Sequence, residues 1–374
     1  RVIAANQTPD HATIARFRQQ HEDALAGLFA ECLRICLAAG LGKVGVVAID
    51  GAKIAASASL AANRTRAAIE AEVRRMLEEA AAVDAAEDAL HGEGVRGDEL
   101  RPELADRTSR RARLAAAKRR LEQAHAARER AHAAHLAERE RIERERGTKL
   151  RGRKPKRPTP DPQAKASTTD SDSSTLWTRQ GYLQGYNGQV AVSSDQIILA
   201  AELTQAENDV GQLHPMIAAT EKSLHGAGVA APIGAVVADA GYLSDQNLAE
   251  ADPAGPELLI ATTSARKLRA AARQGGAPRG RIPTAATPRQ RMERKLLTRR
   301  AQALYRRRAQ TVEPVFGQIK DPRGIRRFMR RGLAACRSEW KLITATRNLL
   351  KLFRYGLHTP ARGRRPPTPA LAAA

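Results

Sequence analysis

Three carboxylates in this sequence lie where they could share metal ions. Asp50 and Asp239 each end a short apolar run typical of a buried strand, and Glu313 lies in a helical segment. Because ligands of α/β sheets bind beyond the ends of the strands, we expect the two aspartates to lie together. Converging carboxylates repel one another unless hard cations hold them, and oxygen ligands suit Mg²⁺ or Mn²⁺. Two such ions about 3.5–4 Å apart can clamp the attacking and leaving oxygens of a phosphodiester displacement.

Each of these carboxylates also fits a simpler role when taken alone. Asp50 precedes a glycine and Asp239 precedes Ala-Gly-Tyr, so either could be a turn residue. Glu313 could be a solvated residue on a helix. Their order on strand, strand and helix, with basic segments beside them, favours the metal-binding interpretation. The rival carboxylates are predicted to lie in a linker and a hairpin turn: Asp170, Asp172 and Asp195.

Apolar runs predict the strands that position these carboxylates. Lys43–Asp50 is β-branched and nearly continuous, as in a strand buried on both faces, and we expect it to end in a turn at Asp50-Gly51. Gly185–Val192 and Ile197–Leu203 are predicted to form a hairpin, and Glu257–Thr262 a further strand. Helical segments surround these runs, so the predicted fold class is α/β, with a mixed sheet flanked by helices.

The composition changes along the chain and predicts five parts. Residues 65–147 are rich in Ala, Arg and Glu with a thin apolar stripe, which is typical of a helical hairpin with antiparallel arms. The chain begins without Met, so its first segment is expected to be truncated. The predicted parts are a helical N-terminal segment (1–42), a strand-bearing domain (43–64 and 177–357), the helical hairpin inserted after its first strand (65–147), a basic and polar linker (148–176) and a disordered tail (358–374).

The overall composition indicates a folded protein with a polyanionic partner. The 374 residues include 63 Lys and Arg against 40 Asp and Glu, which gives a net charge of +23, and 42% are hydrophobic, enough for a sizeable core. Such a basic chain usually binds nucleic acid or an anionic membrane face. No apolar run is long enough for a membrane span, and no signal peptide opens the chain. Three cysteines exclude a disulfide scaffold and lack the spacing of a zinc site, so we expect a cytoplasmic location.

The positive charge is concentrated in two segments. Lys149–Arg157 has six basic residues and no acid, and Arg266–Arg331 has 21 basic residues against three acids. Pro158–Ala265, which lies between them, has 3 basic and 13 acidic residues. This pattern predicts two anion-binding surfaces beside a carboxylate-rich module, and binding that weakens steeply with salt.

Four pieces of the sequence resemble one known family. They are V-V-A-I-D-G-A-K around Asp50, G-Y-N-G-Q-V-A-V-S-S-D-Q-I-I-L-A-A-E-L from Gly185, V-V-A-D-A-G-Y-L-S around Asp239, and V-E-P-V-F-G-Q-I-K from Val312. On these pieces the chain resembles a DDE transposase of a bacterial insertion sequence, a family with an RNase H-like catalytic fold. The resemblance covers nearly the whole chain apart from the tail.

The resemblance implies roles for particular residues. In many relatives a Tyr and an Arg precede the catalytic Glu and a Lys follows it, so Tyr305, Arg308 and Lys320 are expected to hold transposon-end DNA. The family also works as an oligomer, usually a dimer on paired DNA ends, which implies a homodimer in the bacterial cytoplasm, associated with the nucleoid when bound. The three metal-binding catalytic carboxylates of the family, with Mg²⁺ or Mn²⁺ as cofactor, correspond to Asp50, Asp239 and Glu313.

Two further groups of basic residues are expected to contact DNA. Arg151-Gly152-Arg153-Lys154-Pro155 resembles the core of an AT-hook, in which a Gly-flanked arginine pair lies in a narrow A·T minor groove. A basic linker that touches phosphates non-specifically explains the same residues. The second group has almost no acids nearby, which favours phosphate binding over structural ion pairs: Arg326, Arg327, Arg330 and Arg331.

The expected function is DNA transposition, in which metal-dependent cleavage at transposon ends is followed by strand transfer into double-stranded target DNA. One alternative is a nuclease of the same fold that cuts without joining strands. Another is an inactive or truncated transposase derivative that only binds DNA. A third is a coiled-coil adaptor, for which the helical hairpin is the only evidence.

Overall fold

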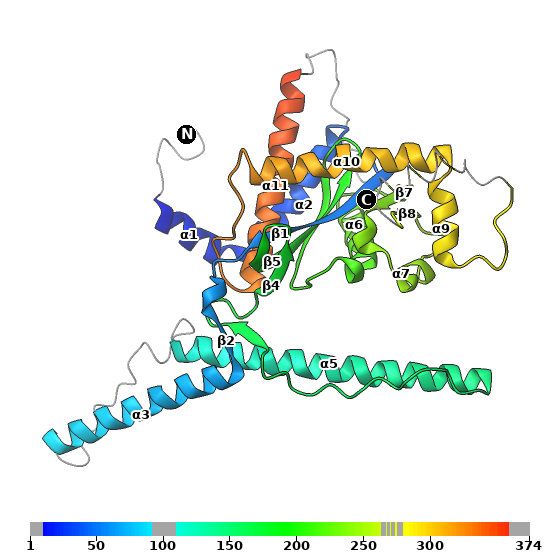
Figure 1. Ribbon diagram of the computed structural model, residues 1–374. Coiled ribbons are helices and arrows are strands. Elements are labelled where there is room, and N and C mark those ends of the chain that lie inside the picture. Colours follow the sequence, from blue (N-terminus) through cyan, green and yellow to red (C-terminus); the bar gives the residue numbers. More distant parts are fainter. Residues whose placement is uncertain are drawn as a thin grey trace, which may run out of the picture. The chain divides into compact units, whose positions relative to one another are not determined.

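The chain forms an α/β protein with a mixed sheet and flanking helices, as predicted (Figure 1). The computed structural model describes residues 10–91, 110–262 and 280–358, together with 267, 270 and 274. Residues 1–9, the connection between the arms of the predicted hairpin and the predicted tail beyond residue 358 lie outside the described residues. The chain divides into two compact units, unit 1 with residues 1–52, 187–326 and 334–374, and unit 2 with residues 53–186 and 327–333.

The sheet combines parallel and antiparallel strands. Its strand order is β4 (Ser174–Thr178), β5 (Gly181–Ser193), β1 (Val46–Ala55), β7 (Ala235–Ala238) and β8 (Glu257–Ile260), with β6 (Ile198–Thr204) paired to β5. β7 pairs in parallel with both β1 and β8, whereas β5 pairs antiparallel with β4 and with β6, which confirms the predicted hairpin. Val47, Val190 and Val236 are fully buried, which explains why these segments appear as continuous apolar runs.

The first strand continues past the point where the sequence predicts its end. The expected turn at Asp50-Gly51 is wrong, because β1 runs through both residues. β1 and β7 pair Ala48 with Val237, and the same register carried two residues further places Asp50 beside Asp239. Pairing along the strand therefore outweighs the local preference of Asp-Gly for a turn.

Helices of unit 1 support the strands that carry the carboxylates. The predicted helical N-terminal segment (1–42) contains two helices, α1 (His11–Gln20) and α2 (Glu22–Ala38), which meet at His21. Trp340 is fully buried, and its Nε1 donates to the carbonyl oxygen of Gln189 at 3.3 Å. None of the described helices is both long and apolar enough to cross a membrane. The other helices are α6 (Leu213–Gly226), α7 (Asp245–Ala249), α9 (Pro288–Leu296), α10 (Arg299–Lys320) and α11 (Leu333–His358), which carries Trp340.

Unit 2 contains a pair of long helices, α3 (Arg66–His91) and α5 (Arg110–Arg146). An ion pair joins the start of α5 to Glu72, and Lys118 further along α5 pairs with Glu70, so the two helices run antiparallel. Exposed ion pairs thus line the contact between the two helices and fix their direction.

A small apolar core joins these helices to a two-stranded sheet. Ile69 on α3 and Leu114 on α5 pack with Ala166 and are nearly inaccessible to solvent. Ala166 lies in β3 (Lys165–Ser167), which pairs antiparallel with β2 (Asn63–Thr65). β3 falls inside the range 148–176 that the sequence assigns to a linker.

Because this core is small, truncating one of its side chains should unfold the helix pair first. We predict that Leu114→Ala destabilises the protein by about 2–5 kcal/mol, through lost burial and the cavity left behind. Leu77→Ala is the matched control, because Leu77 on α3 is 53% exposed. Thermal unfolding followed by circular dichroism compares the two. Equal melting temperatures would show that the helix pair does not depend on this core.

Candidate active site

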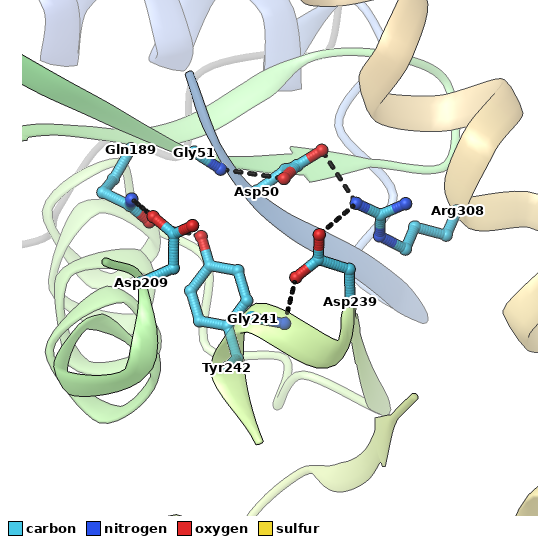
Figure 2. Close-up of polar contacts among 8 residues, drawn as sticks. All are labelled: Asp50, Gly51, Gln189, Asp209, Asp239, Gly241, Tyr242 and Arg308. Carbon is cyan, nitrogen blue, oxygen red and sulfur yellow. Dashed lines mark hydrogen bonds and ion pairs between the residues drawn. The ribbon is translucent and has the colours of Figure 1, made fainter. Parts of the chain in front are cut away.

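Asp50 and Asp239 meet at a single arginine. Nη2 of Arg308 lies 2.9 Å from Oδ2 of Asp50 and 3.5 Å from Oδ2 of Asp239. Arg308 comes from α10, and Figure 2 shows its guanidinium reaching both carboxylates. The structure thus brings together the two predicted strand carboxylates, and it adds a cation between them.

Backbone amides fix the other oxygen of each carboxylate. Oδ1 of Asp50 accepts a hydrogen bond from the amide of Gly51 at 2.9 Å. Oδ1 of Asp239 accepts from the amide of Gly241 at 2.8 Å, and Asp239 thereby caps the short 3₁₀ helix η3 (Ala240–Tyr242). Each carboxylate therefore has one oxygen bound to the backbone and one directed to Arg308.

These contacts do not use all the hydrogen-bond donors of Arg308. Its side chain is 13% exposed, and its Nε is buried without a hydrogen-bond partner among the described residues. Burial by itself would lower the pKa of Arg308, but the charges of Asp50 and Asp239 outweigh this effect and raise it. Arg308 therefore stays protonated and keeps an unused donor at the site.

A third aspartate, which the sequence analysis missed, lies beside this pair. Oδ1 of Asp209 accepts hydrogen bonds from Nδ2 of Asn187 and from Nε2 of Gln189, both at 2.7 Å. The buried hydroxyl of Tyr242 donates to Oε1 of Gln189, so a polar network extends back to η3 (Figure 2). A signal was present in the sequence: Asn187 and Gln189 are amides at alternate positions of a predicted strand.

This network lies so close to residue 51 that any side chain there would displace it. A Cβ atom on Gly51 would lie 2.3 Å from Nε2 of Gln189 and 2.6 Å from Oδ1 of Asp209. It would also lie 2.9 Å from Oδ1 of Asn187. Contacts this short do not occur with real side chains, so the Asp-Gly sequence serves close approach here, not a turn.

Glu313 is not grouped with the two aspartates. Its side chain is exposed on α10, and its charge is felt by Arg308, five residues earlier. Within the described ranges, no three His, Cys, Asp or Glu side chains are arranged to hold a metal ion. The structure therefore brings together two of the three predicted carboxylates, and the role of Glu313 stays a prediction.

Tyr305 and Lys320 lie within electrostatic reach of the acid pair. Burial raises the pKa of Tyr305, and the charges of Asp239 and Asp50 contribute to the rise. Burial lowers the pKa of Lys320, and the charge of Asp50 opposes that fall. Both residues lie on α10, close enough to the acid pair for its charges to affect their pKa values.

The second basic group has neighbours of its own. Arg326 is exposed and forms an ion pair with Asp321 at 2.5 Å. The sequence did not predict this pair, because few acids lie near these arginines. Nε of Arg331 donates to the carbonyl oxygen of Ser57 at 3.0 Å, and Arg327 is exposed. Arg330 is half-buried. These arginines are divided between the two units, since only Arg326 belongs to unit 1.

Comparison with known families identifies the segment that carries α10. Residues 274–353 match the family described as Transposase DDE domain. The match supports a DDE transposase. This family resemblance was expected from the sequence, and a DDE domain indicates an enzyme of the nuclease and transposase type that acts on DNA in transposition. Such enzymes use divalent metal ions. No curated protein and no solved structure matches the chain significantly.

The matched segment contains some of the site residues but not all of them. Tyr305, Arg308 and Glu313 lie inside it, whereas Asp50 and Asp239 lie outside it. The contact of Arg308 with both aspartates therefore links the DDE domain match to the two strand carboxylates.

The charge state of Asp50 depends on pH in a range that can be measured. Burial raises the pKa of Asp50 to about 6, with Arg308 opposing the rise and the charge of Asp239 adding to it. Because this value exceeds that of the unfolded chain, about 3.9, folding favours the protonated form. The stabilising contribution of Asp50 is thus fully present below pH ~4 and is lost as the pH rises through about 6.

An amide at residue 50 should mimic the neutral form at every pH. We predict that Asp50→Asn, without divalent ions, raises the free energy of unfolding above pH 7 by about 1–3 kcal/mol relative to the wild type. Near pH 4 the two proteins should be equally stable. Urea unfolding in EDTA at both pH values measures this, with Glu221→Gln, an exposed acid on α6, as control. A variant less stable than the wild type at pH 8 would contradict the assignment.

Proposed function

We propose that this chain is a DNA transposase that cleaves double-stranded DNA at transposon ends and transfers the cut strands into target DNA. The observation that carries the proposal is the contact of Asp50 and Asp239 with Arg308, a residue of the segment that matches the transposase DDE domain. Two carboxylates on neighbouring strands with a basic helix beside them suit phosphoryl transfer on a polyanion.

The donor atoms at this site fit Mg²⁺, and Mn²⁺ equally. Asp50 and Asp239 offer hard carboxylate oxygens. Oδ1 of Asn187 is buried beside Gly51 with no hydrogen-bond partner among the described residues, which is expected where a water or ligand completes a site. Glu313 is the proposed third ligand, from α10. Bound divalent cations would supply Lewis acidity and an activated hydroxyl for displacement at phosphorus.

The residues of this chain would bind the cations, neutralise the acid pair and orient the DNA phosphates. Asp50 and Asp239 would hold the cations. Arg308 neutralises the two acids in the protein alone, and its guanidinium would turn to a DNA phosphate once cations replace it between them. Tyr305 and Lys320, on the same helix, would hold the phosphates next to the scissile bond. A further set would hold the flanking backbone: Arg326, Arg327, Arg330 and Arg331.

The same proposal covers the catalytic fold and the assembly. Parallel β1, β7 and β8 beside antiparallel β5 and β6 support an RNase H-like catalytic domain, with the helical pair α3 and α5 inserted after β1. By family resemblance the protein would act as a homodimer on paired transposon ends, in a bacterial cell and at the nucleoid.

A cleavage and joining assay tests the proposed reaction. The substrate is a supercoiled plasmid that carries the DNA flanking the coding sequence, incubated with Mg²⁺ or Mn²⁺. We expect the wild type to give both nicked and joined products, and Asp239→Asn to lose both at least 100-fold, because a ligand of the cations is removed. Glu221→Gln removes an equivalent charge from exposed α6 and should retain activity.

Other products would contradict the proposal in distinguishable ways. Nicks without joined products from the wild type would indicate a nuclease of the same fold. Equal inactivity of the wild type and Asp239→Asn, with DNA binding intact in both, would indicate a DNA-binding protein without catalysis. Binding by each variant is measured separately by fluorescence anisotropy in EDTA.

A further inference from the structure

A basic segment of unit 2 lies fixed along a helix. Lys149–Arg157, here called the basic strap, follows α5 and runs back along it (Figure 1). The amide of Leu150 donates to Oε1 of Glu143 at 3.0 Å, and the carbonyl oxygen of Pro155 lies 3.1 Å from Nε2 of His132. As the strap proceeds, its partners on α5 come earlier in the sequence, so the two run antiparallel.

Arg139 makes the strongest attachment between the strap and the helix. Its Nη2 donates to the carbonyl oxygens of Leu150 at 2.6 Å and Gly152 at 3.1 Å. Gly152 has a φ of 103°, a conformation that favours glycine. The helix therefore holds the backbone of the strap, which leaves its side chains free to point elsewhere.

The cationic side chains of the strap are directed to solvent. All six are exposed, and only Arg157 forms an ion pair within the described residues, with Glu129 at 3.1 Å. On α5 itself, Arg141 is compensated by contacts with both Glu138 and Glu145. The other five strap cations are exposed and form no ion pair within the described residues: Lys149, Arg151, Arg153, Lys154 and Lys156.

The row of cations along the strap is suited to the evenly spaced phosphates of a nucleic-acid backbone. Nine residues span at most about 30 Å when extended, and the helix keeps them in line. Duplex DNA carries one negative charge per about 1.7 Å of its axis. A membrane-surface segment would present several large apolar side chains, whereas the strap contains one, the half-buried Leu150.

Attachment to α5 decides between the two ways in which this sequence could contact DNA. Insertion of Arg151-Gly152-Arg153 into a minor groove about 6 Å wide would require the backbone to enter the groove. Arg139 holds that backbone against a helix about 10–12 Å across. The helix cannot follow the strap into the groove, so contacts to the phosphates outside it are favoured.

We propose that the basic strap, ordered on α5, is a phosphate-binding surface for duplex DNA that acts without base recognition. The inference rests on the proposed function for its partner, DNA, but it concerns a surface that contains none of the proposed catalytic residues. The strap binds backbone phosphates through the exposed side chains, and α5 removes the entropic cost of ordering a flexible basic segment.

Salt-dependent binding by the full-length chain tests this surface. Fluorescence anisotropy in EDTA follows binding to an A·T-rich and a G·C-rich duplex from 50 to 300 mM salt. For Arg151→Gln/Arg153→Gln we expect weaker binding to both duplexes by the same factor, and a salt slope smaller by about 2 because two phosphate contacts are lost. The matched control is Arg130→Gln/Arg141→Gln, which removes the same charge from exposed residues of α5 and should change the slope little.

Each other outcome overturns the inference. An equal change of salt slope in both double variants would mean that DNA binding depends on the net charge and not on the position of the strap cations. Loss confined to the A·T-rich duplex, with displacement of the wild type by a minor-groove ligand, would mean groove insertion. Unchanged DNA binding with lost binding to anionic phospholipid vesicles would mean a membrane surface. Because the binding experiments contain no divalent ion, their result does not depend on whether the protein cleaves DNA. Likewise, the cleavage assay can succeed even if the strap does not bind DNA.

Discussion

A single guanidinium group between two carboxylates determines the arrangement of the candidate site. Parallel pairing of β1 and β7 brings Asp50 and Asp239 side by side, and two unit charges 4 Å apart repel by about 4 kcal/mol at an effective dielectric constant of 20. Nη2 of Arg308 contacts both and offsets this repulsion. Since Arg308 belongs to α10, the same contact holds that helix, with Tyr305 and Lys320, over the strand carboxylates.

Close packing around the acid pair gives the site a fixed geometry. The network of Asp209, Asn187 and Gln189 fills the space next to β1, so a side chain at residue 51 would displace it. Tyr242 ties the same network to the 3₁₀ turn that Asp239 caps. A rigid support of this kind is what a site needs if it must hold a phosphodiester in line for displacement.

The sequence predicted the elements of the fold better than the contacts between them. Continuous apolar runs identified the strands that precede Asp50 and Asp239, because burial on both faces leaves a clear pattern. The contact of Arg308 with Asp50 joins residues 258 positions apart, and no local pattern reports it. Asp209 was missed for a similar reason, since an aspartate before a helix is normally a cap. Helical periodicity also does not say which side of α10 faces the strands, so the sequence left both a metal ligand and a solvated residue open for Glu313.

The acid pair and the basic strap belong to different units. Carboxylates meet at β1 and β7 in unit 1, while uncompensated cations extend along α5 in unit 2, so the net charge of +23 conceals two surfaces of different chemistry. DNA backbone is complementary to the second surface, and cation-dependent chemistry on that backbone suits the first.

Anomalous diffraction from crystals of the full-length chain grown with Mn²⁺ would locate the metal ions relative to the acid pair. We expect an anomalous peak within coordination distance of both Asp50 and Asp239, with the guanidinium of Arg308 moved from between them. If Arg308 remained in contact with both carboxylates at saturating Mn²⁺ and no peak lay beside them, these aspartates would not be the metal ligands of the enzyme.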